Sequence, residues 1–204
     1  MNRFRKHNSL SLILLILLIL IGIKFGLKDN IKWEQDIISW NDFIEIDSLS
    51  GGYDANIFSE IKVKGDYKKD NFEVYASMNP NRSYKVKDSS LNKQLLIHEK
   101  YHFNITEYHA RLLRKKIISL GVQKLNKEKI DSLHSSYKYI SLKMQKKYDE
   151  ESDHNTKIRQ QRFWEMEIDD LLRQTEIYKN SNLNSYSKYK NQKTQYFKKV
   201  FLTL

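Results

Sequence analysis

The chain has 204 residues, of which 40% are hydrophobic and 30% are charged, a balance typical of one globular domain and not of a disordered chain. It has no cysteine, which excludes disulfides, thiolate metal sites and a cysteine nucleophile. The formal net charge is +11, but the lysines are spread along the chain without a base-reading motif, so we expect no nucleic-acid partner.

The first predicted element is a membrane-directed segment over residues 1–27. Arg3 to Lys6 supply three positive charges ahead of an apolar run from Leu10 to Ile23. This order is typical of an export signal, and the positive-inside rule keeps the basic residues in the cytoplasm. No small-residue cleavage site follows, which favours an uncleaved signal anchor over a cleaved signal peptide. We therefore expect a single-pass cell-envelope protein with its domain outside the cytoplasm, or a secreted or periplasmic domain if the signal is cleaved.

Residues 28–178 are predicted to form one α+β domain, followed by a basic C-terminal tail over residues 179–204. β-formers and turn residues dominate residues 33–84, which predicts a small antiparallel sheet of about three or four strands. Beyond residue 90, apolar residues recur at spacings of three and four, which predicts about three long helices. We expect the first helix at about residues 91–120, and a polar connection at residues 149–155 between the second and third helices.

A metal-binding pattern, H-E-x-x-H, lies inside the first predicted helix and consists of His98, Glu99 and His102. Residues four apart project from one helix face about one turn apart, so both imidazoles can reach one tetrahedral zinc ion. Glu99 lies beside that face, where it can hold a metal-bound water and accept its proton. The pattern therefore predicts a Zn²⁺ site. The alternative is a pair of hydrogen-bonded core histidines, because burying unpaired imidazoles is costly.

A third protein ligand is expected from another element, because two histidines hold zinc weakly. His109 is about 10 Å along the helix from His102, and Glu107 points away from His98, so neither fits an intact helix. His154, in the polar connection after the second helix, is the preferred third ligand. One alternative is an acidic residue of the same cluster, which contains Asp149, Glu151 and Asp153. The other alternative is Glu107, if the helix is broken.

The segment from Leu95 to Arg114 resembles the signature L-L-x-H-E-Q-x-H-F-D-I-x-E-x-x-A-R-x-L-R of an uncharacterised bacterial family of predicted secreted zinc-dependent proteases. The likeness extends over residues 33–172 and implies a zinc-dependent peptidase. Asn104 replaces an aspartate of the signature, which would orient a ligand histidine more strongly than an amide does. Further positions also resemble the family: Ile38–Phe43, Ser83, Tyr148, Asp149, Glu151, Ser152, His154, Gln161 and Trp164. The other departures are Tyr84, Lys100 and Asn155.

The predicted function is hydrolysis of a peptide bond in a peptide or protein substrate. A zinc ion on His98, His102 and His154 lowers the pKa of its bound water toward about 7, and Glu99 acts as general base. Tyr148 is the candidate donor to the oxyanion, with core packing as its alternative role. Four further residues are candidates to support the ligands: Asn104, Glu107, Asp149 and Glu151.

Two alternatives to a peptidase stay open at this point. The first is an envelope binding or structural protein with a non-catalytic zinc site. Such a site is closed by four protein ligands, whereas a catalytic site leaves one position for water. The second is a metal-free anchored scaffold in which the histidines have no ligand role.

Overall fold

The computed structural model describes residues 27–33, 38–48, 53–69, 71–88, 92–183 and 185–186. The predicted anchor run from Leu10 to Ile23 and most of the predicted basic tail lie outside these ranges, as does Leu91. Within the described ranges, no helix is long and apolar enough to cross a bilayer.

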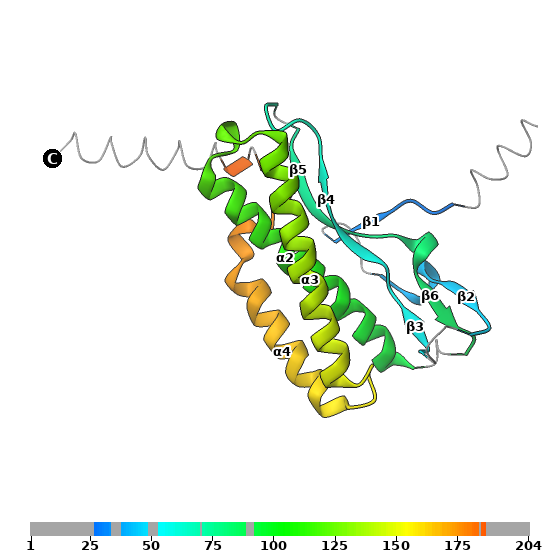
Figure 1. Ribbon diagram of the computed structural model, residues 1–204. Coiled ribbons are helices and arrows are strands. Elements are labelled where there is room, and N and C mark those ends of the chain that lie inside the picture. The colour runs from blue at the N-terminus through cyan, green and yellow to red at the C-terminus, as the bar shows by residue number, and fades with distance from the viewer. Residues whose placement is uncertain are drawn as a thin grey trace, which may run out of the picture.

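The first of two small sheets is antiparallel (Figure 1). Its central strand, β5 (Glu73–Met78), lies between β1 (Ile31–Lys32) and β4 (Ser59–Lys64). Ile61 of β4 lies opposite Ala76 of β5, and both side chains are buried. Val74, Ala76 and Met78 of β5 are fully buried at a spacing of two, so they share the face of this sheet that packs on the helices.

The second sheet is mixed, with β6 (Tyr84–Val86) at its centre. β6 pairs antiparallel with β3 (Ala55–Asn56) and parallel with β2 (Ile44–Ile46). The parallel pair departs from the all-antiparallel expectation, because strands of two or three residues carry too little pattern to reveal their direction. Short 3-10 turns connect the described elements: η1 (Trp40–Asp42), η2 (Pro80–Arg82), η4 (Val122–Lys124) and η5 (Glu176–Tyr178).

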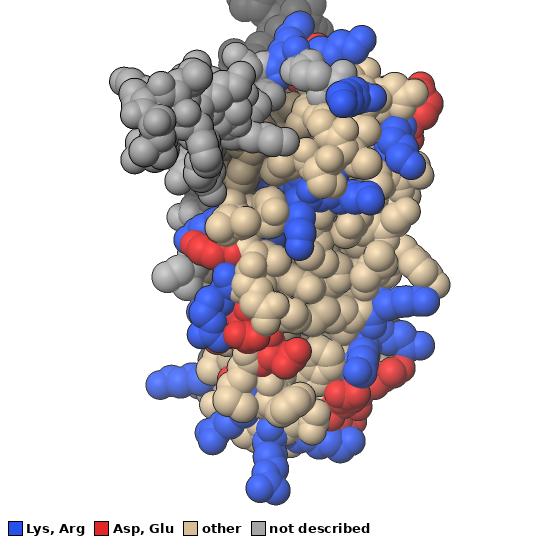
Figure 2. Space-filling model, turned by 90° about the vertical axis from the view of Figure 1, so that its left-hand side faces the viewer, with Lys and Arg blue, Asp and Glu red and all other residues tan. Residues whose placement is uncertain are grey.

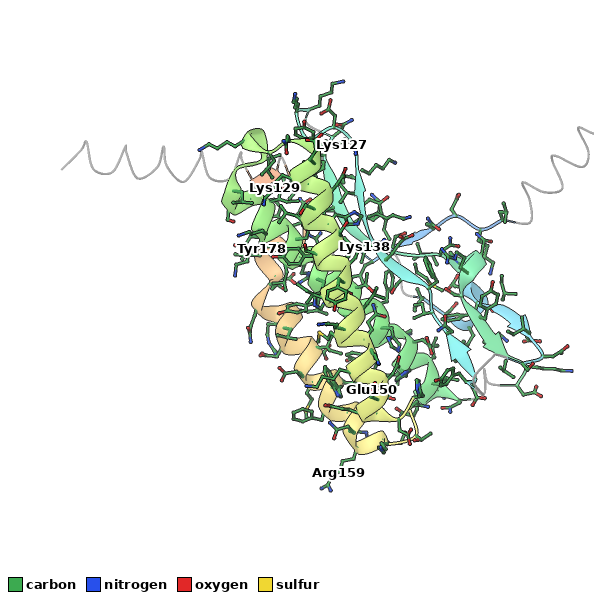
Figure 3. All side chains as sticks on the ribbon, viewed as in Figure 1. Lys127, Lys129, Lys138, Glu150, Arg159 and Tyr178 are labelled. Carbon is green, nitrogen blue, oxygen red and sulfur yellow. The ribbon has the colours of Figure 1, made fainter. Side chains whose placement is uncertain are left out.

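The three predicted helices are α2 (Lys93–Leu120), α3 (Lys127–Ser152) and α4 (Ile158–Gln174), and together with the sheets they confirm the α+β class. The Asn92 side chain caps the start of α2, and Gly121 ends it with a positive φ of 83°. α3 continues to Ser152, past the point where we expected the polar connection to begin. Figure 3 shows Lys127 at the start of α3, Glu150 near its end and Arg159 at the start of α4.

The helix α2 is the centre of the fold. It packs on β4 and β5 with one side and on α3 and α4 with others, so almost no side of it faces water (Figure 1). Phe103, Leu113 and Ile117 of α2 belong to the same buried cluster as Phe72 and Val74 of the sheet layer. A helix surrounded in this way must find a partner for every polar side chain that it carries.

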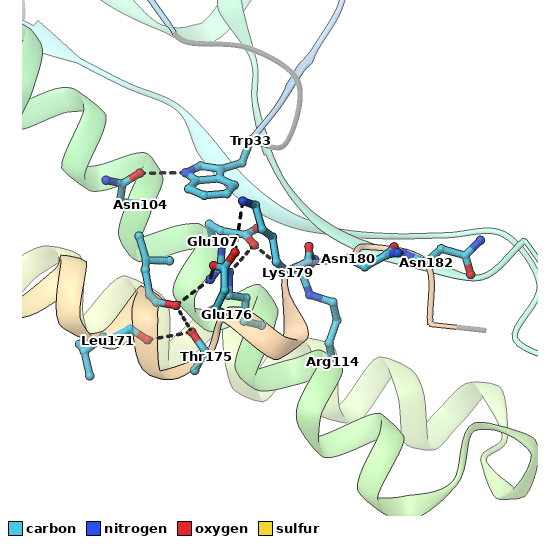
Figure 4. Close-up of polar contacts among 12 residues, drawn as sticks. Trp33, Asn104, Glu107, Arg114, Leu171, Thr175, Glu176, Lys179, Asn180 and Asn182 are labelled. Atoms are coloured by element: carbon cyan, nitrogen blue, oxygen red, sulfur yellow. Dashed lines mark hydrogen bonds and ion pairs between the residues drawn. The ribbon is translucent and has the colours of Figure 1, made fainter. Parts of the chain in front are cut away.

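A buried ionic cluster joins α2 to the end of α4. Glu107, Arg111 and Arg114 are fully buried, and the Glu107 carboxylate accepts hydrogen bonds from both guanidinium groups. Arg111 also donates to the carbonyl of Leu172 at 2.7 Å, and Arg114 donates to the carbonyl of Lys179 at 2.9 Å. The cluster therefore fixes α2 against the chain that follows α4 (Figure 4).

Trp33 attaches the start of the domain to the same helix. Its indole Nε1 donates to Oδ1 of Asn104 at 2.8 Å, and its ring lies 5.0 Å from the guanidinium carbon of Arg111 (Figure 4). Residues about seventy positions apart thus meet on α2, which ties the segment after the predicted anchor to the helical layer.

Replacing Glu107 with alanine should lower the free energy of unfolding by about 3–5 kcal/mol, because Arg114 and Arg111 lose the buried carboxylate between them and Arg111 keeps only the more exposed Glu176. Urea unfolding followed by circular dichroism measures this. Asp131→Ala is the matched control, since it removes the partner of an exposed ion pair with Lys127 and should change stability little. Equal losses in the two variants would contradict the structural role of the cluster.

Candidate metal centre

Three side chains from two helices converge on one point: His98 and His102 of α2 and Asp149 of α3. Oδ1 of Asp149 lies 2.8 Å from Nε2 of His102 and 3.1 Å from Nε2 of His98, and the two Nε2 atoms are 3.2 Å apart. Ligand atoms bound to one tetrahedral zinc ion lie about 3.3 Å from each other. The three residues therefore form a candidate metal-binding triad.

The positions of these ligands follow from the helix geometry. His98 and His102 are one turn apart on the face of α2 that meets α3, as their i, i+4 spacing predicts. Asp149 lies in the last turn of α3, so its side chain has a fixed direction toward that face. Asp149 was an alternative to His154 in the sequence analysis, and the structure brings it into the group.

The electrostatics of the triad suit a cation. Burial lowers the pKa of His98 to about 4, so this imidazole is neutral at pH 7, the form that binds metals. Burial acts to raise the pKa of Asp149 and to lower that of His102, but the contacts between the two groups outweigh it. The pKa of Asp149 is therefore held well below its usual range, and that of His102 is raised. A proton and a metal ion compete for this site.

Gln145 supports one ligand from behind, and the sequence analysis missed it. Its Oε1 lies 3.2 Å from Nδ1 of His102, and its Nε2 donates to Oγ1 of Thr106 at 3.2 Å. Because Oε1 can only accept, Nδ1 of His102 carries a proton, and in the neutral ring Nε2 then presents its lone pair to the site. The signal in the sequence was the position of Gln145, one helical turn before Asp149 on the same face.

Tyr148 forms a wall of the site. Its ring stacks on that of His98 with centroids 4.5 Å apart, and its edge meets Trp164, which donates from Nε1 to Glu151 at 2.9 Å. Burial raises the pKa of Tyr148, so its hydroxyl keeps its proton. Among the described residues, this buried hydroxyl and Nδ1 of His98 have no hydrogen-bond partner. The structure thus shows packing for Tyr148 and leaves its predicted donor role a prediction.

Glu99, the predicted general base, is buried beside the triad. Its Oε2 accepts a hydrogen bond from the backbone N–H of Ile57 at 2.8 Å, which ties α2 to the segment after β3. Burial raises the pKa of Glu99 to about 7. At neutral pH this carboxyl is therefore poised between its acid and base forms.

His154 lies beside the triad but outside the group of close ligand atoms. Its Nδ1 is 3.6 Å from Oδ1 of Asp149, and its ring centroid is 4.2 Å from that of Tyr53. Asp153, His154 and Asn155 all have left-handed backbones, with φ of 51°, 49° and 78°. Asp and Asn adopt this conformation readily, so the cost of about 1–2 kcal/mol falls mainly on His154. The ligand role of His154 stays a prediction.

The other candidate residues are engaged elsewhere. Asn104 binds Trp33, Glu107 lies in the arginine cluster and Glu151 binds Trp164. His109, the other histidine of α2, donates a hydrogen bond from Nδ1 to the carbonyl of Ile105 at 2.9 Å.

No known family model, curated protein or solved structure matches this chain. The resemblance to predicted secreted zinc-dependent proteases therefore stays a prediction, and the site rests on its own geometry.

The full chain should bind one zinc ion, and Asp149→Ala should weaken this binding by at least about 100-fold because it removes one of three ligands. His109→Ala is the matched control on the same helix and should leave the affinity unchanged. Competition with a chromophoric chelator measures both values. Equal zinc affinities in the Asp149→Ala variant and the unmodified chain would contradict the triad.

Gln145→Leu should weaken zinc binding by about 10–100-fold, because His102 loses the acceptor that sets its tautomer. Ser141→Ala serves as the control. The Ser141 hydroxyl lies 3.4 Å from Nε2 of Gln145 and is not the hydrogen-bond partner of the His102 ring. The same chelator competition applies, and an unchanged affinity in Gln145→Leu would show that His102 needs no support.

Proposed function

We propose that the protein is a zinc-dependent peptidase of the cell envelope, with the metal on His98, His102 and Asp149. The observation that carries the proposal is the convergence of these ligand atoms beside Glu99, a buried carboxyl with a pKa of about 7. Two histidines and one carboxylate are a ligand set used by zinc peptidases, and three protein ligands leave one position for water.

Each side chain of the site has a separate role in the proposed reaction. A zinc ion held by His98, His102 and Asp149 would lower the pKa of a water molecule and polarise the substrate carbonyl. Glu99, which is oriented by the N–H of Ile57, would accept a proton from water and pass it to the leaving amine. Tyr148, which keeps its proton because it is buried, is the proposed donor to the oxyanion.

Substrate class and location follow from the sequence. The likeness of Leu95–Arg114 to predicted secreted zinc-dependent proteases supports a peptide or protein substrate. The N-terminal segment, with basic residues ahead of the run from Leu10 to Ile23, supports a domain outside the cytoplasm, attached through this segment to the membrane.

A second candidate function is an envelope binding or structural protein with a non-catalytic zinc site. The position of His154, 3.6 Å from Asp149, favours it, because a fourth protein ligand closes a zinc site to water. Under this candidate, His154→Ala lowers zinc affinity and the chain hydrolyses no peptide. If the protein is instead a peptidase with three protein ligands, the His154→Ala variant keeps its zinc affinity.

Glu99→Gln should keep zinc binding and lower peptide hydrolysis by at least about 100-fold, because glutamine accepts no proton from water. The substitution preserves an oxygen acceptor for the N–H of Ile57, so the fold is spared. Glu151→Gln is the matched control, since it removes a nearby carboxylate that binds only outside the triad.

Hydrolysis of an unstructured protein by the zinc-loaded full chain provides the readout for both variants. Undiminished hydrolysis in Glu99→Gln would overturn the mechanism. A zinc-loaded unmodified chain that cleaves no peptide would favour the second candidate.

A further inference from the structure

A groove of about 540 Å³ lies between α3 and α4, on the side of these helices away from the sheets. Its apolar lining comes from both helices: Ile140 and Met144 of α3, and Phe163 and Leu171 of α4. Figure 2 shows the face that contains α4, where a broad uncharged strip runs between charged side chains at its borders. We call this feature the α3–α4 groove.

The apolar side chains of the α3–α4 groove are unusually open to solvent. Phe163 is 56% exposed and Ile140 is 47% exposed, although both lie on helices that pack against α2. No other part of the described chain covers them. Large apolar side chains gathered in one groove with charged residues at its edge are typical of a protein interface.

The two walls of the groove carry opposite charge. Lys143 and Lys147 lie on the α3 wall, and Glu167 lies on the α4 wall. Lys147 is 3.6 Å from Glu151 of its own helix, so that pair is balanced. Lys143 and Glu167 form no ion pair within the described residues, which leaves one unbalanced charge on each wall.

These two charges lie at the same level of the groove. The Lys147 amine is 5.5 Å from the centroid of the Trp164 ring, which fixes the level at which the two helices meet. α3 and α4 run in opposite directions. The position one turn before Lys147 in α3 and the position one turn after Trp164 in α4 therefore lie at the same height along the groove. Lys143 and Glu167 occupy those positions.

We propose that the α3–α4 groove is the interface of a homodimer in which a second copy packs by a two-fold axis running along the groove. This axis sets α3 of one copy against α4 of the other and keeps every residue at its own height. Lys143 therefore meets Glu167 of the second copy, and the contact occurs twice. The four helices bury Ile140 and Phe163 in a bundle core. A two-fold axis across the groove would instead oppose α3 to α3, with like charges facing.

The first test is the mass of the full chain by sedimentation equilibrium in density-matched detergent, where we expect a dimer. Phe163→Glu places a charge in the bundle core and should give a monomer. Met166→Glu is the matched control, because Met166 is 65% exposed on the same helix but does not line the groove. Circular dichroism verifies that both variants fold.

Charge reversal tests the orientation of the two copies. Lys143→Glu and Glu167→Lys should each weaken self-association by about tenfold, because two attractive contacts become repulsive. An equal mixture of the two variants should form a heterodimer, and the double variant should recover the homodimer.

Four outcomes would overturn the proposal. The first is a monomeric unmodified chain, which is the result expected if residues 187–204 fill the groove instead. The second is a dimer that survives Phe163→Glu, and the third is a dimer that Met166→Glu also dissociates. The fourth is a mixture of the two charge-reversed variants that forms no heterodimer.

Discussion

The burial of α2 on nearly every side is the constraint on which the structure depends. This helix carries eight buried polar or charged residues, and each must be satisfied inside the protein: His98, Glu99, His102, Thr106, Glu107, His109, Arg111 and Arg114. Glu107 neutralises the two arginines, and Glu99 binds a backbone N–H. The histidines near the start of the helix are satisfied differently, because three ligand atoms face one another there.

A neutral His102 cannot donate a hydrogen bond to Asp149. Nδ1 of His102 already gives its proton to Gln145, so Nε2 of a neutral His102 faces the Asp149 carboxylate with a lone pair. Two acceptors 2.8 Å apart repel unless a proton or a metal ion lies between them. The raised pKa of His102 shows the first solution, and zinc coordination is the second.

The same helix serves the stability of the domain and the construction of the site. Its C-terminal half is locked to the end of α4 by the arginine cluster, and Asn104 near its middle binds Trp33 at the start of the domain. Its N-terminal half is then fixed relative to α3, which delivers Asp149 and Gln145 from successive turns. Ligand residues on rigid helices are placed more accurately than residues on loops, which is what a metal site requires.

The sequence alone was sufficient for the α+β class, the three helices and the pairing of His98 with His102, because a long helix and an i, i+4 spacing are local properties. It was not sufficient for the direction of Asp149. We placed this residue in a polar connection, whereas α3 continues to Ser152 and turns its carboxylate inward. The rotation of α3 about its axis is set by packing on α2. The contact of Gln145 with His102 could not be predicted for the same reason.

Zinc-edge X-ray absorption of the full chain, loaded with one equivalent of zinc, tests the central claim most directly. We expect a four-coordinate zinc with two imidazole nitrogens and two oxygens at about 2.0–2.1 Å, one from Asp149 and one from water. Asp149→Ala should change the oxygen contribution and leave both imidazoles in place. Three imidazoles around the metal, or no bound zinc, would contradict an open site built on His98, His102 and Asp149.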